Sequence, residues 1–179
     1  MEQKKAAYTG IYEWVEIITA SLLVITVAFT FLFRLVVVDG SSMDTTLQNG
    51  ERLVLSCLPY TPERGDIVVI SRGMDSEPLI KRVIGVAGDT VSIDANEGKV
   101  YLNGEVLDEP YIQVETAPER MQDAVTVSDG SVFVMGDNRL AGKSLDSRTF
   151  GCVEVERLMG KVVYRVAPFE RWGGLYDEF

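Results

Sequence analysis

The sequence contains no histidine, and this absence excludes several catalytic mechanisms at once. Without an imidazole the chain cannot form a Ser-His-Asp triad or a Cys-His dyad, and it cannot bind zinc through histidine. Any nucleophile must therefore use another base. The two cysteines, Cys57 and Cys152, are too few for a four-thiolate zinc site or a disulfide framework, so we interpret them as small buried hydrophobic residues. We expect neither a metal nor a cofactor.

Proline is also scarce, with 6 residues among 179, and hydrophobic residues make up 46% of the chain. This composition excludes the disordered and collagen-like classes, and the length suits one domain with a short appendage. The net charge is -10, and residues 1–38 hold equal numbers of acidic and basic side chains, so residues 39–179 carry the whole excess. Because an acidic body repels phosphate backbones, we expect no nucleic acid as a partner.

One long apolar run lies near the amino terminus. Residues 14–33 contain a single charge, Glu16, and a helix of that length spans about 30 Å, which is the thickness of a bilayer core. Apolar residues occupy all of its faces, which favours a transmembrane anchor over a buried core helix. A cleaved secretory signal ending at residues 38–40 is the alternative, although the run is longer than a usual signal core. Basic residues flank the run on both sides, so their count does not decide its orientation.

The remaining sequence indicates an all-β body, either a barrel or a sandwich. Short β-branched segments alternate with glycine, asparagine and aspartate, and Asn103-Gly104 is typical of a tight type I′ hairpin turn. We predict a surface loop at 116–129. The aromatic tail at 169–179 is interpreted either as packing under the barrel or as contacting a membrane interface. The predicted strands are 52–55, 66–70, 80–86, 90–93, 99–102, 131–135 and 160–166.

Two segments contain candidate catalytic residues. The first, residues 38–47, is a turn rich in glycine and hydroxyl residues that includes Ser41 and Ser42. The second, residues 79–89, is a β-branched run interrupted by Lys81. Because side chains alternate along a strand, Lys81 points away from its neighbour Arg82 and is a candidate for burial. A buried lysine loses affinity for its proton and becomes available as a neutral general base. Each segment has an ordinary alternative: a capped turn, or a lysine extending from an edge strand to solvent.

A third segment, Gly136-Asp137-Asn138-Arg139 followed by Ser144 to Gly151, is dense in charges and hydroxyls. With all three segments in this order, the chain resembles the bacterial type I signal peptidases, in particular the small form with a single anchor. The resemblance covers nearly the whole chain. It implies a mainly β catalytic domain, a signal-peptidase-like barrel or sheet, preceded by one transmembrane helix. The implied organisation is a cytoplasmic segment at 1–13, a membrane anchor at 14–35 and an extracytoplasmic catalytic domain at 36–179.

The resemblance also implies a serine endopeptidase that cleaves signal peptides from secretory preproteins after small residues, at the surface of a lipid bilayer. Ser42 matches the nucleophile and Lys81 the general base, and the Ser42 N–H matches one donor to the oxyanion. Gly40 occupies a position where some relatives supply a serine hydroxyl, and Ser144 matches the hydroxyl that orients the base. The matching supporting residues are Asp137, Arg139, Asp146 and Arg148. The candidates for lining the substrate pockets are Met43, Leu47, Leu79 and Ile80.

Two departures from the family pattern leave other interpretations open. Thr45 replaces the family's usual proline, and residues 140–143 make the loop before Ser144 longer than expected. One alternative is a self-cleaving repressor protease, which also uses Ser-Lys chemistry but has a DNA-binding segment at its amino terminus. The other is an inactive binding module tethered to the membrane.

Overall fold

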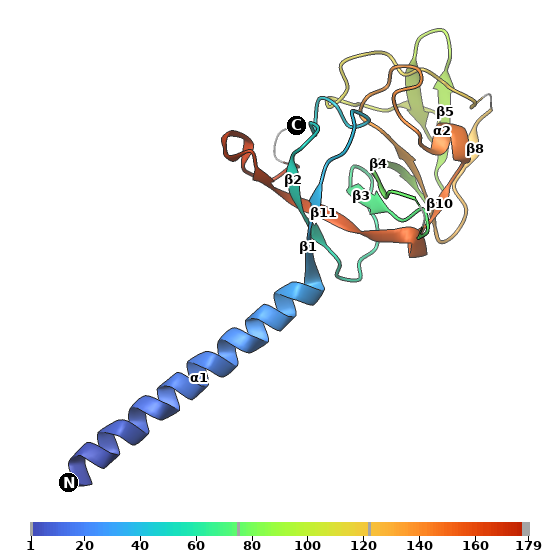
Figure 1. Cartoon of the computed structure of the whole chain (residues 1–179). Coiled ribbons are helices and arrows are strands. Elements are labelled where there is room, and N and C mark those ends of the chain that lie inside the picture. Colours follow the sequence, from blue (N-terminus) through green and yellow to red (C-terminus); the bar gives the residue numbers. More distant parts are fainter. Residues whose placement is uncertain (1, 75, 122, 177–179) are drawn as a thin grey trace.

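The computed structural model describes residues 2–74, 76–121 and 123–176, and in these ranges a long helix leads directly into a β body (Figure 1). The β body is built from two sheets, with only short helical segments between strands. The elements in chain order are α1 (Glu2–Leu32), β1 (Phe33–Val37), β2 (Arg52–Ser56), β3 (Ile67–Ile70), β4 (Leu79–Val86), β5 (Thr90–Asp94), β6 (Lys99–Leu102), β7 (Glu105–Val106), β8 (Val125–Thr126), β9 (Ser131–Met135), α2 (Ser147–Phe150), β10 (Val153–Glu154), η1 (Val155–Arg157), β11 (Leu158–Ala167) and η2 (Phe169–Arg171).

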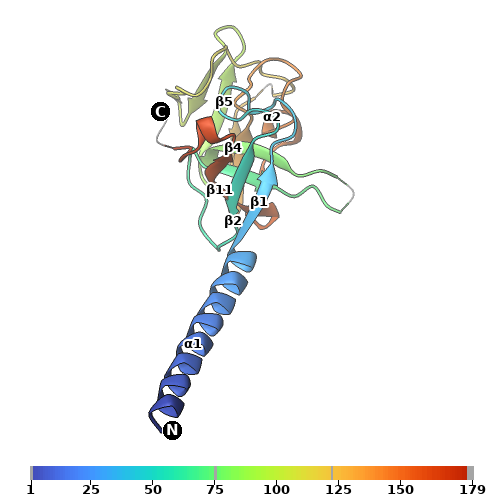
Figure 2. The same ribbon diagram turned by 60° about the vertical axis from the view of Figure 1, so that its left-hand side comes forward.

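Helix α1 projects away from the β body in both views (Figure 1, Figure 2). Its segment Tyr12–Leu32 is 21 residues long, is apolar enough to cross a membrane, and buries none of that surface in the rest of the described chain. The predicted apolar helix is therefore present. It ends at Leu32, whereas the sequence suggested an anchor extending to residue 35. The difference arises because Phe33–Val37 is as apolar as the helix but pairs into the sheet.

Strand β1 joins the helix to the body without a linker. It pairs antiparallel with β2, from Phe33 opposite Ser56 to Val37 opposite Arg52. The Cys57 N–H also donates to the Leu32 carbonyl at 2.8 Å, so the last residue of the helix is itself bonded to the sheet. The segment that follows β1 is therefore held at a fixed place relative to the end of α1.

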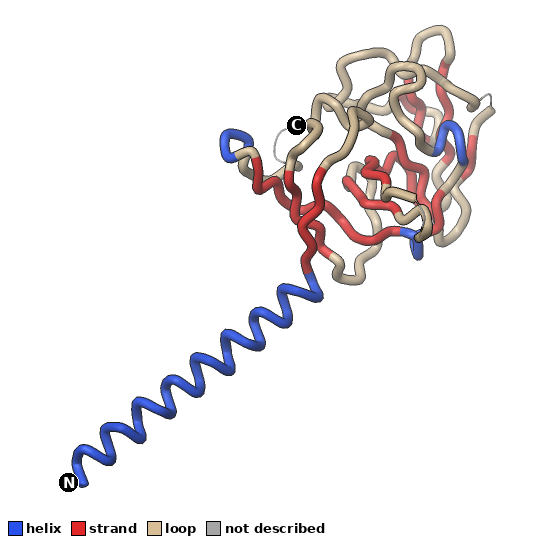
Figure 3. The backbone as a smooth tube through the Cα atoms, viewed as in Figure 1, coloured by secondary structure: helices blue, strands red, loops and turns tan. Residues whose placement is uncertain are grey.

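The larger sheet has seven strands in the order β1-β2-β11-β3-β4-β9-β10, and it curls on itself (Figure 3). The smaller sheet has four strands in the order β7-β6-β5-β8. Strands β3 and β9 are buried along their whole lengths, as expected from their continuous runs of apolar residues. One apolar cluster inside the larger sheet combines residues of β2, β3 and β11 with Met43 and Leu47, so the turn after β1 is anchored in the core.

The structure confirms the mainly β class and each predicted strand, with ends that differ by two residues at most. The Asn103-Gly104 hairpin is confirmed as well, since both residues have positive φ angles, 56° and 86°, between paired β6 and β7. The sequence did not predict β1, the two-residue strands β8 and β10, or the short helical segments α2, η1 and η2. Strand β8 falls within the predicted loop at 116–129, and Thr116 at the start of that loop is buried.

The carboxyl-terminal segment packs partly on the core, and its membrane-interface interpretation stays a prediction. Leu175 is fully buried, and the Tyr176 hydroxyl donates to the Val162 carbonyl at 2.8 Å, so this part packs on the core. Phe169 and Trp172 stack on each other and remain exposed. Residues 177–179, which include the last aromatic side chain, lie outside the described residues. Cys57 and Cys152 are both free thiols that are partly buried.

Candidate active site

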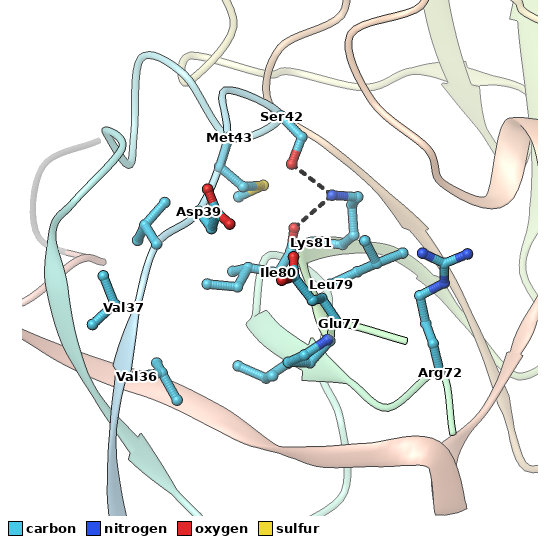
Figure 4. A pocket seen from close by; sticks show the side chains of 13 residues that line it. Val36, Val37, Asp39, Ser42, Met43, Arg72, Glu77, Leu79, Ile80 and Lys81 are labelled. Carbon is cyan, nitrogen blue, oxygen red and sulfur yellow. Dashed lines mark hydrogen bonds between the residues drawn. The ribbon is translucent and has the colours of Figure 1, made fainter. Parts of the chain in front are cut away.

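A cavity of about 390 Å³ lies between the segment after β1 and the first residues of β4 (Figure 4). Ser42 and Lys81 both line this cavity, and charged side chains of Asp39, Arg72 and Glu77 also border it. The remaining lining is apolar and includes Val36, Val37, Val38, Met43, Val69, Leu79 and Ile80. The cavity thus brings a hydroxyl and an amine together in mainly apolar surroundings, in which a charged amine is poorly solvated.

Lys81 contacts the candidate nucleophile directly. Its Nζ donates to Ser42 Oγ at 2.7 Å and to the Ile80 carbonyl at 2.8 Å (Figure 4). The second contact fixes the orientation of the amine, because it occupies one of the three available donor positions. Ser42 is half-buried, and Lys81 is only 1% exposed. The 2.7 Å between Lys81 Nζ and Ser42 Oγ is within the range that proton transfer from a nucleophile to its base requires.

The position of Lys81 follows from its strand. β4 pairs with β3, with Lys81 opposite Val68 and Arg82 opposite Ile67, and the two basic side chains point to opposite faces. Burial lowers the pKa of Lys81 from its ordinary value of 10.5 to about 8. The carboxylates of Asp146 and Asp137 act in the opposite direction, and the Arg148 guanidinium lowers the pKa further. Desolvation is the largest of these effects, so the amine is poised near neutral pH.

Ser42 lies in a tight turn whose backbone is held by Asn138. The Leu47 N–H donates to the Met43 carbonyl at 2.8 Å within the turn, and the Asn138 N–H donates to the Ser42 carbonyl at 3.1 Å. Among the described residues no acceptor is bonded to the Ser42 N–H. Gly40 has a φ of 90°, and its own N–H is engaged by Asn49 Oδ1 at 2.9 Å. The free amide at Ser42 is consequently the donor available to a developing oxyanion.

Ser144 approaches the site through Asp146 and the backbone of Gly136. Its Oγ donates to Asp146 Oδ2 at 2.6 Å, and within the described chain no hydrogen bond joins it to Lys81. Asp146 also accepts from the Gly136 N–H at 3.0 Å and from two guanidinium nitrogens of Arg148, at 2.9 and 2.7 Å. A Cβ on Gly136 would collide with the Ser42 carbonyl oxygen and with Ser144 Oγ, so only glycine fits between the two serines. Ser144 therefore lies beside the nucleophile's turn.

A second buried ion pair lies behind the dyad. Asp137 accepts from two guanidinium nitrogens of Arg82, at 2.9 and 2.7 Å, and from the Thr46 hydroxyl at 2.5 Å. Arg139 pairs with Glu109 and donates through Nε to the Gly136 carbonyl at 2.8 Å. All of these side chains are buried.

Three of these residues, Arg82, Glu109 and Thr46, were not among the candidates from sequence. The available signals were the position of Arg82 inside a β-branched run, and a carboxylate before a proline at Glu109. Neither signal indicates which side chain the residue contacts. Of the predicted pocket residues, Met43, Leu79 and Ile80 line the cavity, whereas Leu47 is packed in the core beneath the turn and does not border it.

Comparison with known proteins places this arrangement in a family. The family model described as signal peptidase, peptidase S26, matches residues 11–167, which is most of the chain. Signal peptidase I of Bacillus licheniformis is 36% identical over 172 residues, covering 89% of this chain and 90% of that protein. Signal peptidase IB of Staphylococcus aureus (strain COL) is 31% identical over 181 residues, covering 90% of this chain and 92% of that protein.

The chain belongs to the signal peptidase family. Membership makes it a serine endopeptidase, and it does not favour the self-cleaving repressor protease or the inactive module. A crystal structure of a signal peptidase I from Enterococcus faecalis V583 is 30% identical to the chain, covering 57% of this chain and 97% of that one with a TM-score of 0.46.

The two departures from the signal peptidase pattern have structural explanations. Thr45 has a φ of 97°, which proline cannot adopt, and its hydroxyl donates to the Tyr111 carbonyl at 2.9 Å. The turn therefore uses a tertiary hydrogen bond where a proline would restrict φ. In the longer loop, the Lys143 N–H donates to the Leu140 carbonyl at 3.2 Å, and residues 140–143 form an exposed turn. The extra residues loop outward and leave Ser144 buried beside Gly136.

Proposed function

We propose that this signal peptidase removes signal peptides from secretory preproteins, with Ser42 as the nucleophile and Lys81 as the general base. The observation that carries the assignment of the two residues is the 2.7 Å contact between Lys81 Nζ and Ser42 Oγ inside a mainly apolar cavity. In a chain without histidine, a desolvated lysine is a base that can be neutral near physiological pH.

Acylation follows from this geometry. With the amine neutral, the Ser42 hydroxyl donates to the lone pair on Lys81 Nζ, which takes its proton as Oγ attacks the scissile carbonyl carbon. The negative charge that forms on the carbonyl oxygen is stabilised by the Ser42 N–H. The protonated amine then donates to the leaving nitrogen as the C–N bond breaks. The products of this step are the free amino terminus of the mature protein and an ester between Ser42 and the signal peptide.

Deacylation uses the same two residues. Neutral Lys81 takes a proton from water, and the hydroxide attacks the ester carbonyl. Collapse of the tetrahedral intermediate releases the signal peptide as a carboxylic acid, which loses its proton to solvent, and Lys81 returns its proton to Ser42 Oγ. The dyad is regenerated, and one water molecule has been consumed for one peptide bond.

The supporting residues hold the dyad and shape its surroundings. Ser144, Asp146 and Arg148 form one buried group beside Gly136, and Arg139 braces the backbone of the same segment. Met43, Leu79 and Ile80 contribute the apolar walls of a cavity that accepts small side chains before the scissile bond. Leu47 supports these walls from the core, and Gly40 supplies no side-chain donor to the oxyanion.

The anchor gives the enzyme its topology. We propose that α1 crosses the bilayer once, that residues 1–13 lie in the cytoplasm, and that the β body lies outside the cell. Because β1 begins directly after Leu32, the cavity stays within a few strand lengths of the membrane surface. Substrates held in the same bilayer are then concentrated near Ser42 without any additional contact.

The test uses full-length protein in detergent or lipid with a preprotein that has alanine at the first and third positions before the cleavage site. We expect one cut at that site, identified by sequencing the new amino terminus. Ser42→Ala and Lys81→Ala should each abolish it, and the double variant should lose little more because the two residues act as a unit. Ser41→Ala, which changes the exposed neighbouring serine, is the matched control and should cleave normally. Normal turnover by either dyad variant would refute the residue assignment.

A bulky side chain just before the scissile bond should block cleavage, because the apolar side chains beside Ser42 leave room for small residues only in the proposed binding mode. Deleting residues 1–31 should slow processing of membrane-embedded precursor more than that of a short soluble peptide. The deletion stops before β1, since removal of residues 1–35 would also take three residues of that strand. Cleavage only within the enzyme's own chain, or indifference to the bulky residue, would contradict the proposal.

A further inference from the structure

Thr46 is a buried residue at the end of the Ser42 turn, and it is bonded on one side to the strand of the base. Thr46 is only 2% exposed, and its hydroxyl donates to Asp137 Oδ2 at 2.5 Å. Asp137 in turn holds the guanidinium of Arg82 through two hydrogen bonds. Because Arg82 directly precedes Val83 and follows Lys81 on β4, this chain of contacts connects the turn of the nucleophile to the backbone of the base.

On its other side Thr46 is bonded to the end of the chain. Its carbonyl accepts from Arg165 Nη2 at 2.7 Å and from Arg171 Nη2 at 3.2 Å. Glu51 pairs with both arginines, through Arg165 Nε at 3.1 Å and through Arg171 Nη1. Arg165 and Glu51 are 1% and 2% exposed. Buried charges of this kind persist only when each is paired, so the group is held in one arrangement around the Thr46 carbonyl.

These contacts matter because Ser42 lies in the turn after β1, whereas Lys81 lies on β4, a distant strand of the same sheet. In the larger sheet β2, β11 and β3 separate β1 from β4, so no backbone ladder joins the turn after β1 directly to the strand of Lys81. The Thr46 hydroxyl crosses this gap to β4 by way of Asp137, and the Thr46 carbonyl ties the turn to β11, the strand midway between them. The 2.7 Å separation of the dyad atoms therefore depends on contacts outside the sheet.

We propose that Thr46 is a positioning residue for catalysis, which holds Ser42 at the distance from Lys81 that proton transfer needs. The inference rests on the proposed roles of Ser42 and Lys81. Thr46 is not among the residues that border the cavity, so it acts through the dyad and not by contacting substrate. Two different groups of residues hold Thr46. Its hydroxyl is bonded to the Asp137–Arg82 pair, and its carbonyl is bonded to the two arginines of the Glu51–Arg165–Arg171 group.

The test compares Thr46→Val with Thr46→Ser in the full-length enzyme. Valine keeps the shape and the backbone carbonyl but removes the hydroxyl, whereas serine restores the hydroxyl. We expect kcat to fall by about tenfold or more in Thr46→Val with KM little changed, because a small displacement of a reacting atom costs a large factor in rate. Thr46→Ser should recover most of kcat. Thr61→Val, which alters an exposed threonine in the loop after β2, is the matched control and should equal wild type.

All rates are measured at a temperature at which circular dichroism shows every variant to be folded. Under that condition, a purely structural role of Thr46 predicts a lower melting temperature for Thr46→Val with kcat unchanged. That result would overturn the inference, as would a rise in KM without a change in kcat. If Thr46→Val does not fold, Arg171→Gln provides the second variant, since that side chain is 29% exposed and its loss still leaves Arg165 on the Thr46 carbonyl. A partial fall in kcat at unchanged KM supports the inference, and wild-type kcat overturns it. Failure of the wild-type enzyme to cleave the preprotein would instead refute the proposed function.

Discussion

Lys81 makes the pH dependence of the enzyme a quantitative test of its burial. A lysine with a pKa of about 8 is neutral in about one molecule in ten at pH 7 and in about nine in ten at pH 9. The value of kcat/KM, which reports the free enzyme, should thus rise about tenfold between these pH values and then level off. A lysine at its ordinary pKa of 10.5 would instead give a rise of about a hundredfold over the same interval, with no levelling before about pH 10.

The same shift affects stability, with a definite sign. In the unfolded chain Lys81 binds its proton up to about its ordinary pKa of 10.5, and in the folded chain only up to about 8. Between these pH values the unfolded state holds more protons, so the free energy of unfolding increases as the pH rises. Below about pH 8 the full net cost of holding the ammonium in its folded surroundings is present, about 3 kcal/mol from the difference of the two pKa values.

The assay pairs initial rates on a short peptide substrate with unfolding of the full-length protein in detergent, each from pH 6 to pH 10.5. Lys81→Met removes the buried charge, so below pH 8 it should unfold at higher temperature than wild type, and the difference should shrink as the pH rises toward 10.5. The reasoning is refuted if the rate follows a pKa near 10.5, or if the difference in stability between the two proteins does not change with pH.

Two further substitutions probe the supporting structure. Gly136→Ala should abolish cleavage, because the added Cβ collides with the Ser42 carbonyl oxygen, whereas Gly173→Ala meets no atom within 4 Å and should cleave normally in the same rate assay. Asp137→Ala removes the carboxylate that holds the buried Arg82 guanidinium through two contacts, and the free energy of unfolding in detergent should fall by about 3–5 kcal/mol. Glu97→Ala breaks an ion pair whose two side chains are each 54% exposed, and should cost less than about 1 kcal/mol. An equal loss in both carboxylate variants would count against the role assigned to burial.

The strands and the burial of Lys81 could be predicted because they depend on local pattern. Alternation along β4 places Lys81 and Arg82 on opposite faces of the strand. The β-branched run around Lys81 indicates that the face of the strand carrying Lys81 is buried. The hairpin at Asn103 was predictable for the same reason, since the positive φ angles required by its turn are accessible to asparagine and glycine. In each case the information lies within a few residues of the feature.

The partners of the buried charges could not be predicted, because they depend on how distant strands meet. Arg165 reaches the Thr46 carbonyl across 119 positions in the sequence, and Arg82 reaches Asp137 across 55. Periodicity shows which face of a strand is buried but not which strand lies opposite. The helix ends before residue 35 for a different reason, since Phe33–Val37 has the composition of a membrane span and only its pairing with β2 makes it a strand.

The Lys81 amine can become neutral near two carboxylates. Asp146 and Asp137 both raise the pKa of Lys81, and unpaired carboxylates this close would keep the amine protonated. Each carboxylate is instead held by its own guanidinium, Asp146 by Arg148 and Asp137 by Arg82, through two nitrogen contacts apiece. Desolvation has the largest effect on the pKa of Lys81, and the Arg148 guanidinium adds to it and so opposes part of the effect of the two carboxylates. We therefore expect the buried Asp146–Arg148 pair to serve the chemistry as well as the fold, because its guanidinium helps to keep Lys81 neutral in a chain without histidine.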